Sequence, residues 1–179
     1  REGRRGVGGG AGVPRGARGG DRARRDVSGL GHLTVLQRRT VAGGGAGNAT
    51  ALGRRLAASL AKELSEAGLA VASGLARGID TAAHEGALAN GTVAVVAGGV
   101  DNIYPPENAA LYERIRAQGC IISEMPLGRS PQARHFPRRN RIISGVSRGV
   151  VIVEAAEGSG SLITANYALE QGREIFAVP

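Results

Sequence analysis

From Val41 onward, short unbroken runs of apolar residues alternate with longer stretches that have the composition of helices. Runs such as VAVVAG (residues 93–98) and VVIVEA (150–155) do not alternate with polar residues. Such runs are typical of strands that are covered on both faces in a parallel sheet. Strands and helices in regular alternation favour an α/β domain with a doubly wound, mainly parallel sheet and helices on both faces.

The same pattern predicts where the elements lie. The expected strands are Val41–Gly44, Leu69–Ala72, Thr92–Ala97, Cys120–Ser123, Val150–Glu154 and Glu174–Val178. The expected helices are Ala49–Ala67, Ile79–Leu88, Glu107–Gln118, Arg139–Val146 and Leu162–Gln171. Right-handed crossovers place the loops that follow the strands along one edge of the sheet, where folds of this class bind ligands.

Charge divides the chain into two parts. Residues 1–40 contain ten Arg and three acidic residues, whereas residues 41–179 carry a net charge of only +1. The first part also contains eleven Gly and few large apolar residues, so it buries too little surface to fold. We expect residues 1–38 to be a basic Arg/Gly-rich, largely disordered segment and residues 39–179 to be the folded domain. The segment either attracts nucleic acid in a salt-sensitive way or is simply solvated.

Composition argues against several kinds of protein. Cys120 is the only cysteine and lies in GCIISE, a predicted buried strand, which excludes disulfides within the chain. His32, His84 and His135 lack the spacing of metal ligands. The sequence has no apolar run of the kind that a signal peptide or a membrane span requires. We therefore expect a cytoplasmic protein with neither a metal nor a cofactor.

The stretch VAGGGAGNATALGRR (41–55) places a cluster of glycines between an expected strand and an expected helix. It fails as a dinucleotide fingerprint, because no register from Gly43 or Gly45 has the spacing G-x-G-x-x-G. The start of the helix, capped by Asn48 or Thr50, can still bind an anion through its backbone N–H groups. The alternative is a plain turn from strand to helix.

The segment RSPQARHFPRRNRIISGVS (129–147) gathers arginines around one aromatic residue, Phe136. Arg138 and Arg139 fall in the first turn of an expected helix, where the helix dipole disfavours positive charge. A bound polyanion reverses this effect, and Phe136 would stack a base beside it. In the alternative interpretation, Phe136 packs in the core and the arginines pair with acids such as Glu124 or Glu154.

Two other loops add candidates. In SGLARGID (73–80), Arg77 can extend the basic patch. Asp80 and His84 lie one helical turn apart, which suits an acid–base pair or, alternatively, a cap and a packing residue. The GSGS loop (158–161) offers small residues and hydroxyls that a phosphate can approach, or only a helix start.

Taken together, five motifs closely resemble the DNA-processing protein A family, also called Smf, over about Arg39 to Pro179: SGLARGIDTAAHEGAL, GGVDNIYPPEN, SEMPLG, FPRRNRIISGVS and GSGSLITANYALEQGREIFAVP. The resemblance implies an extended Rossmann-like fold with about six or more strands. It also implies a protein, not an enzyme, that binds single-stranded DNA, forms a homodimer and helps to load the RecA recombinase during natural transformation. The residues that it places in the DNA-binding site are Gly45, Ala46, Gly47, Asn48, Ser73, Gly74, Arg77, Arg134, Phe136, Arg138, Arg139, Asn140, Arg141, Ser159, Gly160 and Ser161.

The chain departs from the family pattern in three places. Gly47 stands where the family has an Arg that contacts DNA, so we expect weaker DNA binding. The Arg/Gly-rich start is atypical, and the chain ends at Pro179, so we expect the small winged-helix domain of many members to be absent. Two other functions remain open: a nucleotide phosphoribohydrolase on the same fold, or a module that mainly contacts RecA or a second copy of itself.

Overall fold

The computed structural model describes residues 6–7 and 26–178. Its strands are β1 (Gly6–Val7), β2 (Val27–Gly31), β3 (Thr40–Gly45), β4 (Ala70–Ser73), β5 (Thr92–Val95), β6 (Cys120–Ser123), β7 (Gly149–Val153) and β8 (Glu174–Ala177). Its helices are α1 (Ala51–Glu66), α2 (Ile79–Ala87), α3 (Ala109–Gln118), α4 (His135–Gly145) and α5 (Gly160–Glu170), with short 3-10 turns η2 (Leu33–Gln37) and η3 (Pro106–Asn108). Every strand and helix expected after residue 40 is present.

The strands form one eight-stranded sheet in the order β1-β2-β6-β5-β4-β3-β7-β8. All pairs from β6 to β8 are parallel, and β1 and β2 add antiparallel pairs at one edge. From β3 the chain winds outward through β4, β5 and β6, and then crosses back to β7 on the other side of β3. The prediction of an α/β, doubly wound and mainly parallel sheet is confirmed.

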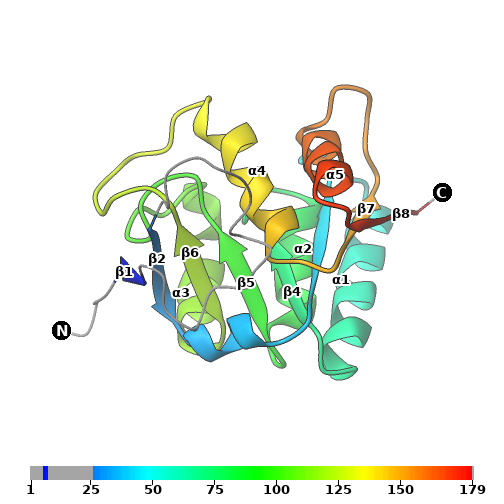
Figure 1. Cartoon of the computed structure of the whole chain (residues 1–179). Coiled ribbons are helices and arrows are strands. Elements are labelled where there is room, and N and C mark those ends of the chain that lie inside the picture. Colours follow the sequence, from blue (N-terminus) through cyan, green and yellow to red (C-terminus); the bar gives the residue numbers. More distant parts are fainter. Residues whose placement is uncertain (1–5, 8–25, 179) are drawn as a thin grey trace.

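Helices cover both faces of the sheet (Figure 1). On one face, α4, α5 and η2 enclose a core that contains Val93, Cys120 and Ile142. On the other face, α3 packs through Ile115, and α1 and α2 pack through small residues such as Ala57 and Ala82. The central strands are buried on both sides, which explains their unbroken apolar runs.

The folded part begins earlier than residue 39, which corrects the predicted domain boundary. Residues of β2 pair with β6 over Ser28–Gly31, and Val35 and Leu36 of η2 are buried in the core. The basic composition of the first forty residues conceals this short apolar stretch, since most of the large apolar residues among them fall between Val27 and Leu36. The predicted disorder of residues 1–5 and 8–25 lies outside the described residues.

Cys120 is buried in β6, as the sequence predicts, and burial raises the pKa of its thiol to about 12. The described residues include no helix with the length and apolar character needed to span a bilayer.

Candidate nucleic-acid interface

The change in winding direction at β3 leaves a crevice beyond the carboxyl ends of β3 and β7, since the loops that follow these strands turn away from each other. A cavity of about 270 Å³ lies there. We call it the switch-point cavity. It is lined by the glycines of β3, the turn after β4, the start of α4 and the start of α5. Segments that are far apart in the sequence thus meet at this site.

Among the glycines of β3, Gly45 allows another backbone segment to approach closely. A Cβ atom at Gly45 would lie 1.8 Å from the carbonyl oxygen of Val153 in β7, so the position excludes any side chain. A Cβ atom at Gly44 would meet Ser161 of α5 at 3.9 Å. The glycine cluster therefore forms a wall of the cavity that consists of backbone alone. Gly destabilises a strand, but at Gly45 no residue with a side chain would fit.

The start of α1 already holds a carboxylate. Thr50, one of the two caps expected from the sequence, is the N-cap, and its hydroxyl accepts from the Gly53 amide at 3.0 Å. Glu154, which follows β7, accepts from the Thr50 amide at 2.8 Å and from its hydroxyl at 2.7 Å. Because this carboxylate occupies the place that an anion would take at the helix end, the glycine loop is not a free phosphate site there.

Arg139 is buried under the cavity, and this revises its predicted role as a phosphate contact. The helix α4 begins at His135, four residues before the expected start, so Arg139 points inward from its second turn. Its Nη1 donates to the carbonyl oxygens of Gly74 and Val95, and its Nε donates to Oδ1 of Asn140 at 3.1 Å. Its guanidinium thus ties α4 to the ends of β4 and β5.

Asp80 balances the charge of Arg139. Its carboxylate accepts from the amides of Gly74 and Ala76 at 3.1 and 3.2 Å, which fixes the turn after β4. Burial raises the pKa of Asp80, and the Arg139 guanidinium offsets part of that rise.

His84 is fully buried and its Nδ1 lies 2.7 Å from the hydroxyl of Thr92, while burial lowers its pKa to about 3. Asp80 and His84 are therefore turn-fixing and packing residues, and not an acid–base pair.

Phe136 lines the cavity from the first turn of α4 and is half-buried. Its ring lies 5.6 Å from that of Tyr104 and 5.9 Å from the guanidinium carbon of Arg139. Asn140, the neighbour of Arg139, donates to the Gly160 carbonyl oxygen at 3.0 Å and so joins α4 to the start of α5. The aromatic ring thus lines the cavity while it contacts a second ring and a buried cation.

The GSGS loop closes the cavity from the side of α5. Ser159 is the N-cap of this helix, and its hydroxyl lies 2.7 Å from that of Ser161. Ser159, Gly160 and Ser161 all line the cavity. These hydroxyls and the exposed backbone can donate hydrogen bonds to a phosphate or a base.

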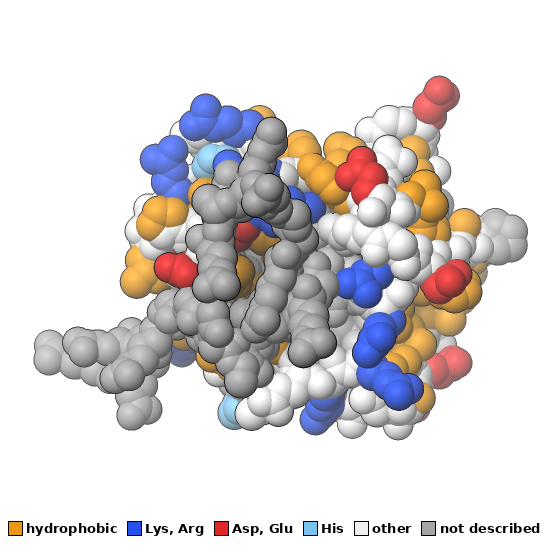
Figure 2. Space-filling model, in the orientation of Figure 1, with side chains coloured by type: hydrophobic (Ala, Val, Ile, Leu, Met, Phe, Trp, Pro, Cys, Tyr) orange, Lys and Arg blue, Asp and Glu red, His pale blue; other side chains and the backbone are white. Residues whose placement is uncertain are grey.

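The remaining arginines of the cluster differ in accessibility. Arg141 forms an ion pair with Glu124, which is only 6% exposed, in agreement with the alternative that an acid neutralises it. Arg134 is exposed at the start of α4, and Arg138 is half-exposed without an ion-pair partner in the described part of the chain. Figure 2 shows Lys and Arg side chains gathered at its upper left, over the loop that leads into α4.

The other predicted residues either line the switch-point cavity or lie next to it. Gly47 lines it and has nothing within 4 Å of a Cβ atom built on it. Ser73 and Gly74 line it from the end of β4. The neighbours of Gly47, Ala46 and Asn48, lie on the same loop, and Asn48 is exposed. Arg77 instead lines a different hollow, together with Arg54 and Arg55.

Sequence reasoning missed Tyr104 as a member of the site. This side chain is 46% exposed and supports Phe136 from the loop after β5. The signal was available, since an aromatic residue in a loop that follows a parallel strand lies at the ligand-binding edge.

Within residues 6–7 and 26–178, no group of three or more His, Cys, Asp or Glu side chains has the arrangement of a metal site.

The chain is similar in sequence to a family of known proteins. The profile of a family described as DNA recombination-mediator protein A matches residues 27–179. The DNA processing protein DprA of Bacillus subtilis (strain 168) is 47% identical over 152 residues, which cover 83% of this chain and 51% of the relative. Protein Smf of Escherichia coli (strain K12) is 51% identical over 130 residues, 71% of this chain and 35% of the relative. The chain thus spans about half or less of the length of these relatives.

Solved structures show the same fold. DprA from Streptococcus pneumoniae has a TM-score of 0.82 and 40% identity, with 87% of this chain and 56% of that chain covered. DNA processing protein A from Helicobacter pylori, described with its unique mode of binding single-stranded DNA, has a TM-score of 0.87 and 29% identity, with 93% and 78% covered. A molybdenum cofactor binding protein from Rippkaea orientalis, at 16% identity and a TM-score of 0.57, shares the fold alone.

Proposed function

The chain belongs to the DNA recombination-mediator protein A family, and we propose that it binds single-stranded DNA at the switch-point cavity without catalysing a reaction. The observation that carries this proposal is Phe136, an aromatic ring held at the wall of a cavity that also offers backbone groups and hydroxyls. A base stacks on such a ring with little sequence preference. The H. pylori relative, described as binding single-stranded DNA, supports the same assignment.

The size of the cavity suits part of one nucleotide. At about 270 Å³ it is below the range of about 300–1,000 Å³ that is typical of ligand pockets. We infer that one base or sugar enters beside Phe136, while Ser159 and Ser161 donate to it. Arg134 and Arg138 then contact the phosphates on either side, because Arg139 and Arg141 are engaged within the protein.

Further steps of the proposal rest on the family resemblance. We propose that the protein acts in the cytoplasm as a homodimer, and that the bound strand is passed to the RecA recombinase during natural transformation. Among relatives of this family, proteins named for DNA processing support a role in handling DNA. A pull-down of RecA by the purified chain, with and without bound oligonucleotide, tests the partner directly.

Salt dependence provides the first test of DNA binding. If three or four phosphates are bound, the logarithm of the association constant should fall with the logarithm of salt concentration with a slope of about −2 to −3. Fluorescence anisotropy with labelled oligothymidylate measures this slope. A flat response, or equal affinity for a duplex of the same length, would contradict binding of single strands through phosphates.

Replacing Gly47 by Arg should tighten binding. Gly47 is exposed beside the cavity, its backbone is not in the left-handed region, and the added side chain meets open space. A new phosphate contact should steepen the salt slope by about 0.7. The matched control is Gln118→Arg, which adds the same charge at the exposed end of α3, at the opposite edge of the sheet. Equal gains in both variants would mean that only net charge matters.

A further inference from the structure

A second hollow of about 430 Å³ lies between α1 and α2, outside the switch-point cavity. Arg54 and Arg55 of α1 and Arg77, just before α2, line it together with one acid, Glu85. We call it the arginine hollow. The binding mode proposed above makes no use of these three cations.

The arginine hollow adjoins the switch-point cavity. The two are separated by the loop after β3 and the turn after β4, and these segments touch each other. The Ile79 amide donates to the Ala46 carbonyl oxygen at 3.2 Å, and a Cβ atom at Gly78 would lie 2.5 Å from the carbonyl oxygen of Gly47. A DNA strand that leaves the switch-point cavity across Gly47 would therefore reach the arginine hollow directly.

Two arginines of α1 supply positive charge to the arginine hollow. Arg54 and Arg55 lie in the second turn of α1, whose first turn contains no acid. Arg54 donates to the Ala49 carbonyl oxygen at 2.8 Å, and Arg55 is exposed without an ion-pair partner among the described residues. The guanidinium groups attract an anion in the hollow by charge and by hydrogen bonding, whereas the start of α1 itself is occupied by the Glu154 carboxylate.

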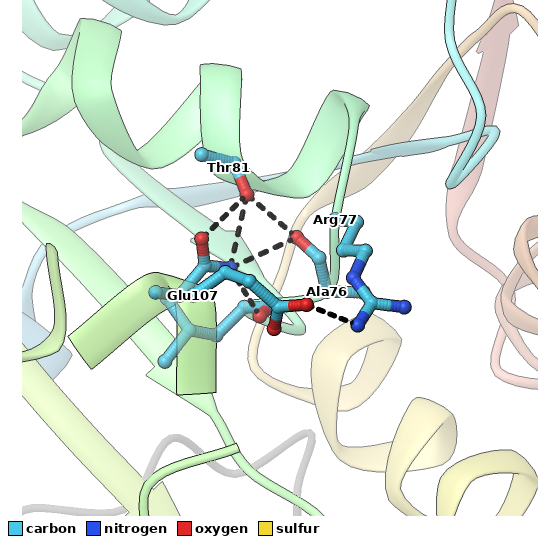
Figure 3. A network of polar contacts seen from close by, with 6 residues as sticks. Ala76, Arg77, Thr81 and Glu107 are labelled. Atoms are coloured by element: carbon cyan, nitrogen blue, oxygen red, sulfur yellow. Dashed lines mark hydrogen bonds and ion pairs between the residues drawn. The ribbon is translucent and has the colours of Figure 1, made fainter. Parts of the chain in front are cut away.

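Arg77 is presented by a rigid turn and is held by one acid. The side-chain amide of Asn108 donates to the Leu75 carbonyl oxygen and to the Thr81 hydroxyl, both at 3.0 Å, and Thr81 donates to the Ala76 carbonyl oxygen at 2.8 Å. Figure 3 shows the Arg77 guanidinium facing Glu107 beside this network. Both partners are more than half exposed, at 61% and 59%, so the pair is weak and can exchange for another anion.

Building on the proposed function, we propose that the arginine hollow is a second phosphate site, which binds the backbone of the same DNA strand where it leaves the switch-point cavity, and that Glu107 competes with those phosphates for Arg77. Stacking holds the short segment of DNA in the switch-point cavity. The arginine hollow contributes to the affinity only when the DNA strand is long enough to reach it. Hydrogen bonds from its own backbone amide and from Arg77 lower the pKa of Glu107, so its competing charge is present at neutral pH.

The test compares oligothymidylates of about 4 and about 16 nucleotides, the range of site sizes typical of single domains that bind such strands. The double variant Arg55→Gln/Arg77→Gln should weaken binding of the longer strand and reduce its salt slope by about 1.4, with the shorter strand unchanged. The matched control is Arg148→Gln/Arg116→Gln, which removes one exposed cation and one partner of an exposed ion pair at the opposite edge of the sheet.

Glu107→Gln tests the competition. It should tighten binding of the longer strand by about two- to fivefold at low salt, the range expected for one exposed charge pair. Its control is Glu113→Gln, which frees Arg116 in the same way. Equal effects of the test and control variants would overturn the second site, although the wild-type protein still binds. Failure of the wild-type protein to bind either strand would instead overturn the proposed function.

Discussion

Replacing Arg139 by Leu should lower the free energy of unfolding by about 1–3 kcal/mol for each buried carbonyl oxygen that is left without its donor. Arg139 is only 8% exposed, and its loss leaves the Asp80 carboxylate without its cation. It also leaves the carbonyl oxygens of Gly74 and Val95 without this donor. Urea unfolding followed by circular dichroism measures the change.

Two further variants separate this effect from a general loss of charge. Arg138→Leu removes the neighbouring, half-exposed cation and should change stability by less than about 0.5 kcal/mol. Asp80→Asn/Arg139→Leu removes both charges and should be more stable than Arg139→Leu alone, since no uncompensated buried charge remains. Similar losses in Arg138→Leu and Arg139→Leu would contradict the buried role of Arg139.

Replacing Phe136 by Ala should weaken binding of oligothymidylate by about 1–3 kcal/mol, or about 5- to 150-fold, without changing the salt slope. The ring supplies a stacking surface and no charge, so the number of bound phosphates stays the same. Fluorescence anisotropy at several salt concentrations measures the affinity and the slope together. A change in the slope would show that Phe136 acts by positioning the arginines and not by stacking.

The control for Phe136 is the other phenylalanine of the chain. Phe176 lies in β8 and is 57% exposed, away from the residues that line the switch-point cavity. Phe176→Ala should bind oligothymidylate as the wild-type protein does. Phe136→Tyr, which keeps the ring, should retain most of the affinity. Equal losses in both Ala variants would point to a surface effect unrelated to the cavity.

The fold was largely predictable because its signals are local. Unbroken apolar runs such as residues 93–98 mark strands that are buried on both faces, and the order of strands and helices limits the topology. The strand β2 was missed because its residues follow a basic, glycine-rich segment, and its partner β6 lies some ninety residues away. Its stability comes from that distant pairing, which no local pattern records.

The candidate site was predictable only in part. The loops that follow the strands were expected to meet at one edge, and most predicted residues do line one cavity there. The roles of individual arginines were not predictable, because adjacent positions on a helix face different surroundings. Arg138 is half-exposed, whereas Arg139 is buried against the ends of β4 and β5.

The residue pattern alone was enough to establish the α/β class and the family and to indicate the loops of the candidate site, because periodicity and motif spacing are properties of the chain itself. The tertiary structure decided which groups remain available to a ligand. Glu154 occupies the start of α1, Glu124 pairs with Arg141, and Gly47 stays open. These outcomes depend on which distant side chain comes within hydrogen-bonding distance after the sheet has assembled, and that is a property of the packed fold.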